Sequence, residues 1–258
     1  MNDLTGLELR LACDITRDGF AACDVAELCN DRSMLVPLAT LGNTFAAGEK
    51  VAFVKRQVES GILRNTFKPF VVKYQEEQRF TPDHPLYRFG NLPAVQRVVD
   101  SVTSQRMRLC SADLWYVLPN AADANRNYGS SWHRDPEDRD TIKVYLFLTD
   151  VTPKSGPIEY VVGSHRANSK YAGVGQPQHY APQDEVEAIP EDDKRRFCYP
   201  AGTLLFFHSG GLHRGGYTQG AHRINTVWTY VPEGAILPRN FTLVSNGPTQ
   251  ETRRPALV

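Results

Sequence analysis

The sequence has no excess of charge of either sign. Its 258 residues include 29 lysines and arginines and 29 aspartates and glutamates, so the formal net charge is zero. Without a basic excess, the composition gives no reason to expect binding to nucleic acid or to an anionic membrane surface. The short charged cluster at residues 192–196 is predicted to be a solvated loop, because like charges need water. We therefore expect a small molecule as the partner.

Long hydrophobic runs and paired cysteines are also missing. No stretch approaches the roughly 18 consecutive apolar residues that a membrane-spanning helix needs. The polar start, residues 1–6, lacks the basic and apolar regions of a signal peptide. The five cysteines are odd in number and form no Cys-x-x-Cys pair, which favours reduced thiols over a disulfide framework or a zinc knuckle. We expect a soluble, cytoplasmic protein, and the sequence leaves its oligomeric state open.

The first part of the chain, residues 1–105, is predicted to be mainly helical. One helix is expected to begin near Asp18-Gly19-Phe20 and to continue through Leu28, because Ala21, Val25 and Leu28 recur at helical spacing. A second helix is expected after Asn91, a possible cap, with Pro93 in its first turn. Its apolar stripe is predicted to face the core: Leu92, Val95, Val98, Val99 and Val102.

From residue 106 the pattern changes to short β-rich runs separated by turn residues. The predicted strands are residues 108–118, 142–148, 158–162, 203–208 and 223–231. Their spacing favours a β-sandwich or barrel, with the helical part packed on one sheet. Residues 166–199 are irregular and are expected to be a lid, a binding loop or a disordered segment. We interpret the chain as one domain with helical support (1–105), a β core (106–232) and a C-terminal extension (233–258).

A candidate metal site begins at His133-Arg134-Asp135. Residues two apart on an extended strand point to the same face, so this imidazole and this carboxylate can bind one ion. His213, in the glycine-rich segment 210–216, would complete a set of two histidines and one carboxylate, the facial triad of non-haem iron(II) oxygenases. An isolated His-x-Asp pair is more often a histidine satisfied by hydrogen bonds. His208 is a rival for the distal position, but a strand is expected to end there, which favours His213.

Arg223 is a candidate anchor for a dicarboxylate, because a planar guanidinium can bind a carboxylate through two hydrogen bonds. Together with the His-x-Asp pair, His213 and the segments Ser155-Gly156-Pro157, 162–165 and 201–208, it makes the chain resemble the phytanoyl-CoA dioxygenase family. The resemblance covers roughly residues 105–232. It implies a double-stranded β-helix, or jelly roll, and an enzyme that depends on iron(II), 2-oxoglutarate and O2.

The resemblance also implies a role for individual residues. His133, Asp135 and His213 would bind iron, and Arg223 would hold the distal carboxylate of 2-oxoglutarate. Members often carry a serine two residues after the distal histidine, but this chain has Gly215 there. One co-substrate contact must then come from elsewhere, and the candidates are Asn225, Tyr116 and Tyr145.

Asp135 favours hydroxylation, or a similar oxidation of an aliphatic C–H bond, over halogenation, since related halogenases replace this carboxylate with a small residue. Two rivals stay open: a jelly-roll protein that only binds a ligand, and a metal-dependent enzyme of another type on the same barrel. Arg223 speaks against both. The substrate is left open. Basic residues near the expected mouth could select an acidic substrate or pair with Glu137, Asp138 and Asp140, and pairing is favoured: Arg126, Arg134, Arg139, Lys143 and Arg214.

Overall fold

Two antiparallel β-sheets form the centre of the molecule. The computed structural model describes residues 4–62, 68, 70–74, 80–119, 131–175, 180–216 and 218–236. The larger sheet has the order β1-β7-β4-β9-β3-β2 and the smaller one β6-β5-β8. The strands are β1 (Phe20–Asp24), β2 (Val71–Lys73), β3 (Met107–Val117), β4 (Ile142–Phe147), β5 (Glu159–Val161), β6 (Lys194–Arg196), β7 (Thr203–His208), β8 (His213–Arg214) and β9 (Arg223–Pro232).

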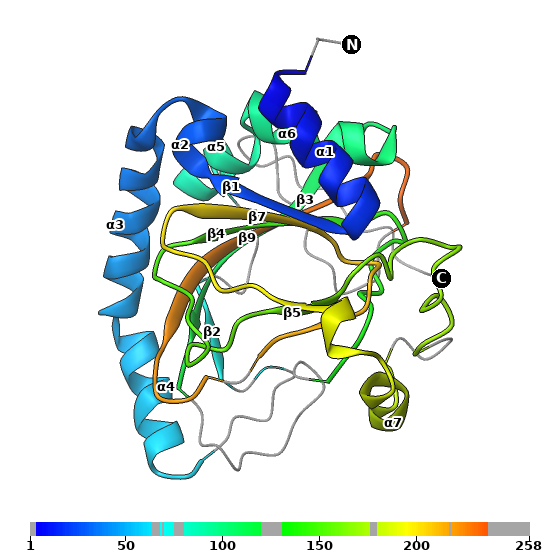
Figure 1. Cartoon of the computed structure of the whole chain (residues 1–258). Helices are drawn as coiled ribbons and strands as arrows, with labels where there is room; N and C mark the ends of the chain where they lie inside the picture. The colour runs from blue at the N-terminus through cyan, green and yellow to red at the C-terminus, as the bar shows by residue number, and fades with distance from the viewer. Residues whose placement is uncertain are drawn as a thin grey trace, which may run out of the picture.

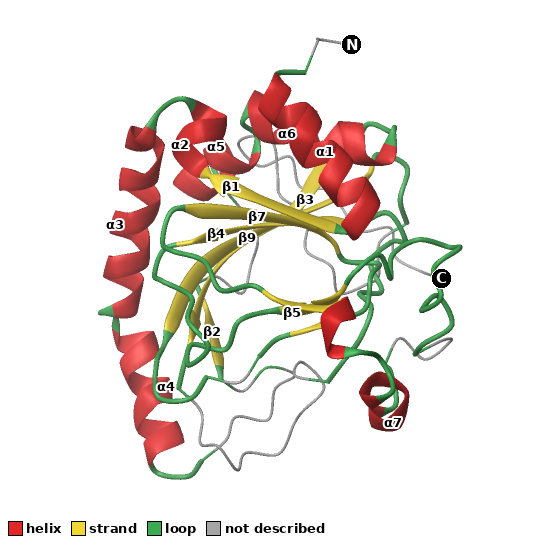
Figure 2. Cartoon of the chain, in the orientation of Figure 1, coloured by secondary structure: helices red, strands yellow, loops and turns green. Residues whose placement is uncertain are grey.

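Most of the helices precede β3 in the chain and lie beside the larger sheet (Figures 1 and 2). The helices are α1 (Gly6–Asp18), α2 (Val25–Cys29), α3 (Leu35–Ala46), α4 (Glu49–Glu59), α5 (Pro85–Gly90), α6 (Pro93–Thr103) and α7 (Gln183–Glu187), with 3-10 turns at Arg32–Met34 and Glu191–Asp193. The mainly β fold with an N-terminal helical part is therefore as predicted. None of the described helices is both long and apolar enough to cross a membrane.

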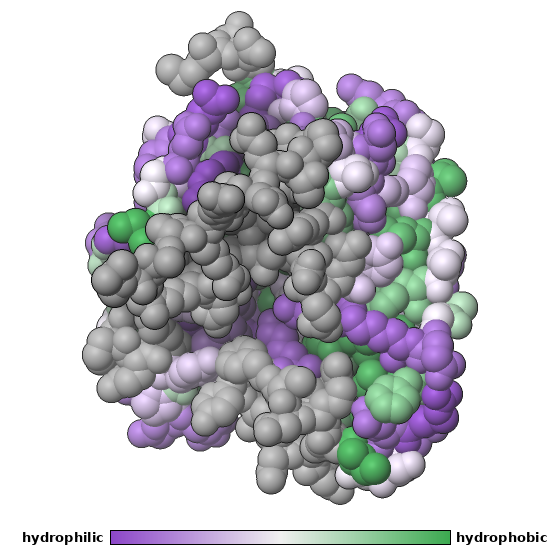
Figure 3. Space-filling model, turned by 180° about the vertical axis from the view of Figure 1, so that it is seen from behind, coloured by the Kyte–Doolittle hydropathy of each residue, from purple (hydrophilic) through white to green (hydrophobic). Residues whose placement is uncertain are grey.

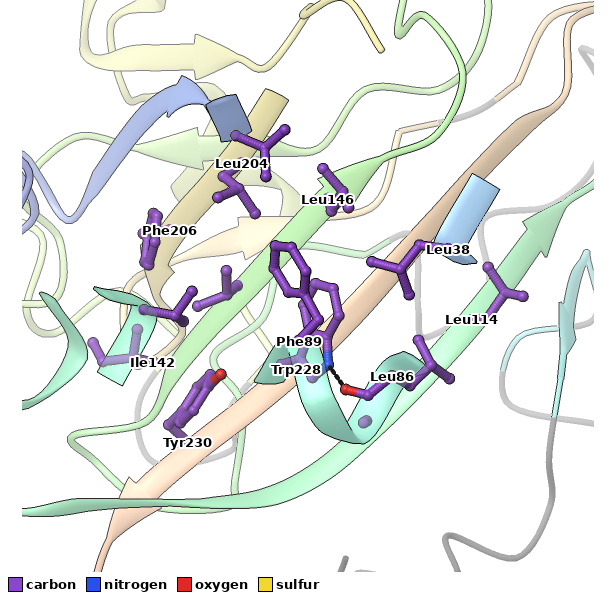
Figure 4. Packing of buried hydrophobic residues seen from close by; sticks show 14 of the residues in the cluster. Leu38, Leu86, Phe89, Leu114, Ile142, Leu146, Leu204, Phe206, Trp228 and Tyr230 are labelled. Atoms are coloured by element: carbon purple, nitrogen blue, oxygen red, sulfur yellow. Dashed lines mark hydrogen bonds between the residues drawn. The ribbon is translucent and has the colours of Figure 1, made fainter. Parts of the chain in front are cut away.

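The main hydrophobic core lies between these helices and the outer face of the larger sheet (Figure 4). The Trp228 indole on β9 donates to the carbonyl oxygen of Leu86 at 2.7 Å, and its ring stacks on Phe89 with centroids 4.7 Å apart. This pairing satisfies the polar atom of a fully buried indole. The helical part thus fixes one face of the sheet and leaves the other face to the site.

An ion pair between a buried carboxylate and a half-buried guanidinium joins α1 to α6. Thr5 and Glu8 form a capping box at the start of α1. The Glu8 carboxylate also accepts hydrogen bonds from Arg97 of α6, the shortest at 2.6 Å. These bonds hold the pKa of Glu8 below its usual value. The link ties the N-terminal helix to the helix that leads into β3.

The prediction of a helix from residue 18 to 28 is wrong in its first part. The helix α1 ends at Gly19, whose φ of 93° suits glycine, and residues 20–24 form β1, an edge strand of the larger sheet. It pairs with β7 from Phe20 opposite Phe207 to Asp24 opposite Thr203. Its partner lies about 180 residues away in the sequence, so local spacing could not reveal the strand. Only the short α2 follows, capped by Asp24.

Two smaller expectations are also adjusted. The cap of α6 is Leu92 and not Asn91, with Pro93 as the first helical residue. The described part of segment 166–199 forms turns, then α7, and then β6, which adds an edge strand to the smaller sheet.

Seen from behind, hydrophobic residues gather on the side formed by α3 and α4 (Figure 3), where Val36 and Phe53 are more than half exposed.

Candidate metal and co-substrate site

The three predicted metal ligands meet between the two sheets. His133 and His213 form an isolated bridge in which each backbone N–H donates to the other's carbonyl, at 2.8 and 2.9 Å. Asp135 Oδ1 lies 3.7 Å from His133 Nε2, and Asp135 Oδ2 lies 3.4 Å from His213 Nε2. One ligand atom from each of the three residues lies within 4.8 Å of the others. In the described part of the chain, this is the group of His, Cys, Asp and Glu side chains that could hold a metal ion.

The hydrogen bonds of both histidines prepare them as metal ligands. His133 Nδ1 lies 2.8 Å from the Ser131 carbonyl, and His213 Nδ1 lies 2.9 Å from the Gly211 carbonyl. Because a carbonyl only accepts, each Nδ1 carries a hydrogen, and each Nε2 is the ring nitrogen that faces Asp135. Burial, followed by the neighbouring His213, lowers the pKa of His133 to about 3, so its imidazole is neutral. Two imidazole nitrogens and one carboxylate fit a divalent ion such as iron(II).

A buried lysine holds the carboxylate ligand from the other side. Lys143 Nζ on β4 lies 2.7 Å from Asp135 Oδ2 and 3.3 Å from Glu137 Oε1. Burial opposes the ionisation of Asp135 and of Lys143, but Lys143 and His213 hold the pKa of Asp135 well below its usual range. The two carboxylates in turn raise the pKa of Lys143. Lys143 thus belongs to an ion-pair network with Glu137, as the sequence favoured.

Arg223 is the first residue of β9 in the larger sheet, and it is buried. Its Nε donates to Asn225 Oδ1 at 3.1 Å, and its Nη1 donates to the Gly156 carbonyl. Burial lowers the pKa of Arg223 to about 10, while the nearby Tyr145 opposes that shift, so the guanidinium is charged at neutral pH. The structure therefore brings three of the predicted co-substrate residues together: Arg223, Asn225 and Tyr145.

Tyr116 is not part of this group, which corrects the sequence prediction. Its ring lies on the helix-covered face, stacked on His222 at 5.1 Å and under Lys55 of α4 at 4.8 Å. Its neighbour Trp115 points the other way and meets Tyr145 edge to face at 5.9 Å. Side chains alternate along a strand, so the sequence found the right strand and the wrong face. The tryptophan is the aromatic residue that this strand gives to the site.

Other residues weighed in the sequence lie elsewhere. His208 is at the end of β7, where its ring packs on His165 at 4.9 Å, so it does not complete the triad. Arg134 is buried and donates to the carbonyls of Ser164 and Gly210, and Arg214 pairs with Glu159 at 2.7 Å. Arg126 lies outside the described residues. Arg134 and Arg214 thus stabilise the segments around the site.

Comparison with known proteins places the chain in a family. The model of the phytanoyl-CoA dioxygenase family matches residues 35–224. The chain belongs to the phytanoyl-CoA dioxygenase family. The predicted enzyme class, a dioxygenase dependent on iron(II) and 2-oxoglutarate, is confirmed at the level of this family.

One curated relative is similar in sequence. L-Proline trans-4-hydroxylase of Streptomyces griseoviridis is 26% identical over 164 residues, which are 54% of this chain and 58% of that protein. The chain thus matches little more than half the length of this relative. Its substrate is a property of that enzyme and not an observation on this chain.

Solved structures confirm the jelly-roll fold. EctD of S. alaskensis, solved with 2-oxoglutarate and 5-hydroxyectoine, has a TM-score of 0.61 at 15% identity, covering 94% of this chain and 82% of its own. The epimerase SnoN of nogalamycin biosynthesis, solved with Fe3+, α-ketoglutarate and nogalamycin RO, has a TM-score of 0.55 at 15% identity, covering 91% and 87%. At 15% identity, the likeness to these two structures concerns the fold alone.

Proposed function

We propose that this protein is an iron(II)- and 2-oxoglutarate-dependent oxygenase that hydroxylates, or similarly oxidises, an aliphatic C–H bond of a small or medium-sized metabolite and releases succinate and CO2. The observation that carries the proposal is the triad: His133 Nε2, His213 Nε2 and one oxygen of Asp135 converge in a buried place. When bound, iron(II) would supply the oxidising power in reaction with O2 and 2-oxoglutarate. The chain's own part is to hold and orient the reactants.

The residues beside the triad support binding of 2-oxoglutarate. Arg223 would hold the distal carboxylate. Asn225, which contacts the Nε of Arg223, would take the role of the serine that many family members carry at the position of Gly215. Tyr145, whose pKa burial raises to about 12, stays protonated and can donate its hydroxyl hydrogen. A guanidinium so deep in the barrel has no evident use in a simple metal hydrolase.

The names of the relatives support a small or medium-sized metabolite as the substrate. One is an L-proline hydroxylase, and solved neighbours contain 5-hydroxyectoine or nogalamycin RO. Asp135 fills the coordination position that a halogenase leaves open, which favours hydroxylation. These points support the class of reaction, and the substrate is taken up below.

The first test is anaerobic. We expect iron(II) followed by 2-oxoglutarate to give the weak visible charge-transfer band of the ternary complex. Asp135→Ala should remove the band, and Arg223→Ala should weaken 2-oxoglutarate binding at least about tenfold, because a charged hydrogen bond contributes about 1.5–3 kcal/mol. The two tyrosines give a matched pair: Tyr145→Phe should weaken binding, and Tyr116→Phe should not.

A wild-type protein that binds neither metal nor 2-oxoglutarate would sink the proposal and favour the jelly-roll binding protein. Metal binding without any 2-oxoglutarate band would favour a metal-dependent enzyme of another type. Equal effects of the two tyrosine variants would contradict the assignment of the strand's two faces.

A further inference from the structure

Lys68 is a cation near the site that belongs neither to the triad nor to the co-substrate residues. It precedes β2, and its Nζ lies 4.5 Å from the centre of the Trp115 ring. The charges that act on it include Lys143, Asp135 and Glu137, and Lys68 itself acts on His133. Trp115 in turn meets Tyr145 at 5.9 Å, so the half-buried ammonium lies near the co-substrate residues.

The other cations near Lys68 have carboxylate partners. Lys143 pairs with Asp135 and Glu137, and Lys73 lies 3.9 Å from Asp113. Among the described residues, no carboxylate lies within ion-pair distance of Lys68, and its ammonium is closer to the Trp115 ring than that of Lys73, which lies 5.9 Å from the ring centre. Burial, followed by the repulsion of Lys143, lowers the pKa of Lys68 to about 8, while Asp135 and Glu137 oppose that shift.

The ion pairs of the site leave two of its described cations without a carboxylate. Lys143 pairs with Asp135 and Glu137, whereas neither Lys68 nor Arg223 has a carboxylate of a described residue within ion-pair distance. 2-Oxoglutarate would use Arg223, so Lys68 would still lack such a partner with the co-substrate bound. A bound anion would give the Lys68 ammonium a partner and offset the cost of its partial burial.

We propose that Lys68, held over the face of Trp115, is the residue that selects the primary substrate, and that this substrate carries a carboxylate. The inference rests on the proposed function, because Arg223 is assigned to 2-oxoglutarate there. It goes beyond that function by naming the substrate class. The carboxylate would belong to the substrate and not to 2-oxoglutarate, since the triad's metal and Arg223 would hold the two ends of the co-substrate.

The test compares carboxylates with their neutral amides. Nickel(II)-loaded protein with saturating 2-oxoglutarate is titrated calorimetrically with cyclohexanecarboxylate and L-proline, and with cyclohexanecarboxamide and L-prolinamide. Wild type should prefer the carboxylates at least about tenfold. Lys68→Met should lose this preference, Lys68→Arg should keep it, and the matched control Lys73→Met should keep it within about twofold.

Three outcomes would overturn the inference: no preference for either carboxylate in wild type, an unchanged preference in Lys68→Met, or its loss in Lys73→Met to the same extent. A separate titration of 2-oxoglutarate distinguishes the source of the anion, because a tenfold loss in Lys68→Met would assign Lys68 to the co-substrate instead. Should wild type bind no metal or 2-oxoglutarate, the proposed function fails by itself. The carboxylate titrations on metal-free protein would then still show whether Lys68 binds an anion.

Discussion

Lys143 shows at the scale of single residues how the site balances its charges. Its ammonium touches two carboxylates, and all three side chains are nearly 90% buried, with exposed fractions of 12% for Lys143 and 11% for each partner. Two anions so close would repel each other without it. A divalent metal at Asp135 adds a second source of positive charge. The stability of the site should therefore depend on the metal when the lysine is absent.

We predict that Lys143→Met destabilises the metal-free protein by about 3 kcal/mol, because removing one partner leaves buried charges uncompensated. Nickel(II) should restore more of the lost thermal stability than it adds to wild type. Melting curves with and without the ion measure both effects. The control Lys154→Met changes an exposed lysine and should alter neither curve. An equal nickel effect in wild type and Lys143→Met would refute this account.

Single residues also show what sequence patterns can and cannot predict. The convergence of His133, Asp135 and His213 was predictable because the family resemblance assigns these motifs to one site. The choice between Trp115 and Tyr116 was not, because β3 is buried on both faces and has a bulge between Leu109 and Ser111, which hides the phase of the alternation. Lys68 lies in a connecting segment, where no periodic pattern indicates direction.

At the scale of elements, the Glu8–Arg97 pair makes the packing of α1 on α6 sensitive to acid. A carboxylate whose pKa is lowered in the folded state stabilises that state fully above its unfolded pKa of about 4.5. The contribution is lost as the pH falls through the lower, folded pKa. Glu8→Gln should therefore cost about 1–2 kcal/mol at pH 7.

This cost should shrink below about pH 4, where wild type loses its charge as well. Urea unfolding of both proteins between pH 7 and pH 3 measures the difference. Glu49→Gln, which alters an exposed pair on α4, is the control and should have little effect at any pH. A Glu8→Gln cost that does not depend on pH would assign the role to packing instead of charge.

The elements also differ in how well sequence indicates them. The helix α6 was predictable from its apolar stripe, which is buried at Val95, Val98 and Val99. The strand β1 was not, because its five residues become a strand only through pairing with β7. Local spacing reports local structure, and an edge strand formed by a distant partner lies outside its reach.

For the whole molecule, the position of the site between two sheets predicts that ligands stabilise the fold. His133 and His213 come from distant segments that meet only in the folded state, so metal and 2-oxoglutarate should bind the folded chain alone. At about 100 times its dissociation constant, a ligand adds about 2.7 kcal/mol. For a chain of this size, that raises Tm by about 5–10 °C.

Thermal shift measurements with nickel(II) and 2-oxoglutarate test this prediction, and Asp135→Ala should abolish the rise.

The overall fold was predictable in class, since strand spacing and the family resemblance agree on a jelly roll. The order of strands in the larger sheet was not, because it depends on which distant segments pair.

The pairing of β1 with β7 also has a consequence for synthesis of the chain. The first strand emerges from the ribosome about 180 residues before its partner does. At about 5–20 residues per second, it waits roughly 10–40 s. During that time the nascent chain presents Phe20, Ala22 and the open backbone of β1 without the neighbour that covers them. This edge of the sheet therefore cannot close until late in synthesis, and the newly made chain stays open to capture by chaperones there until β7 appears.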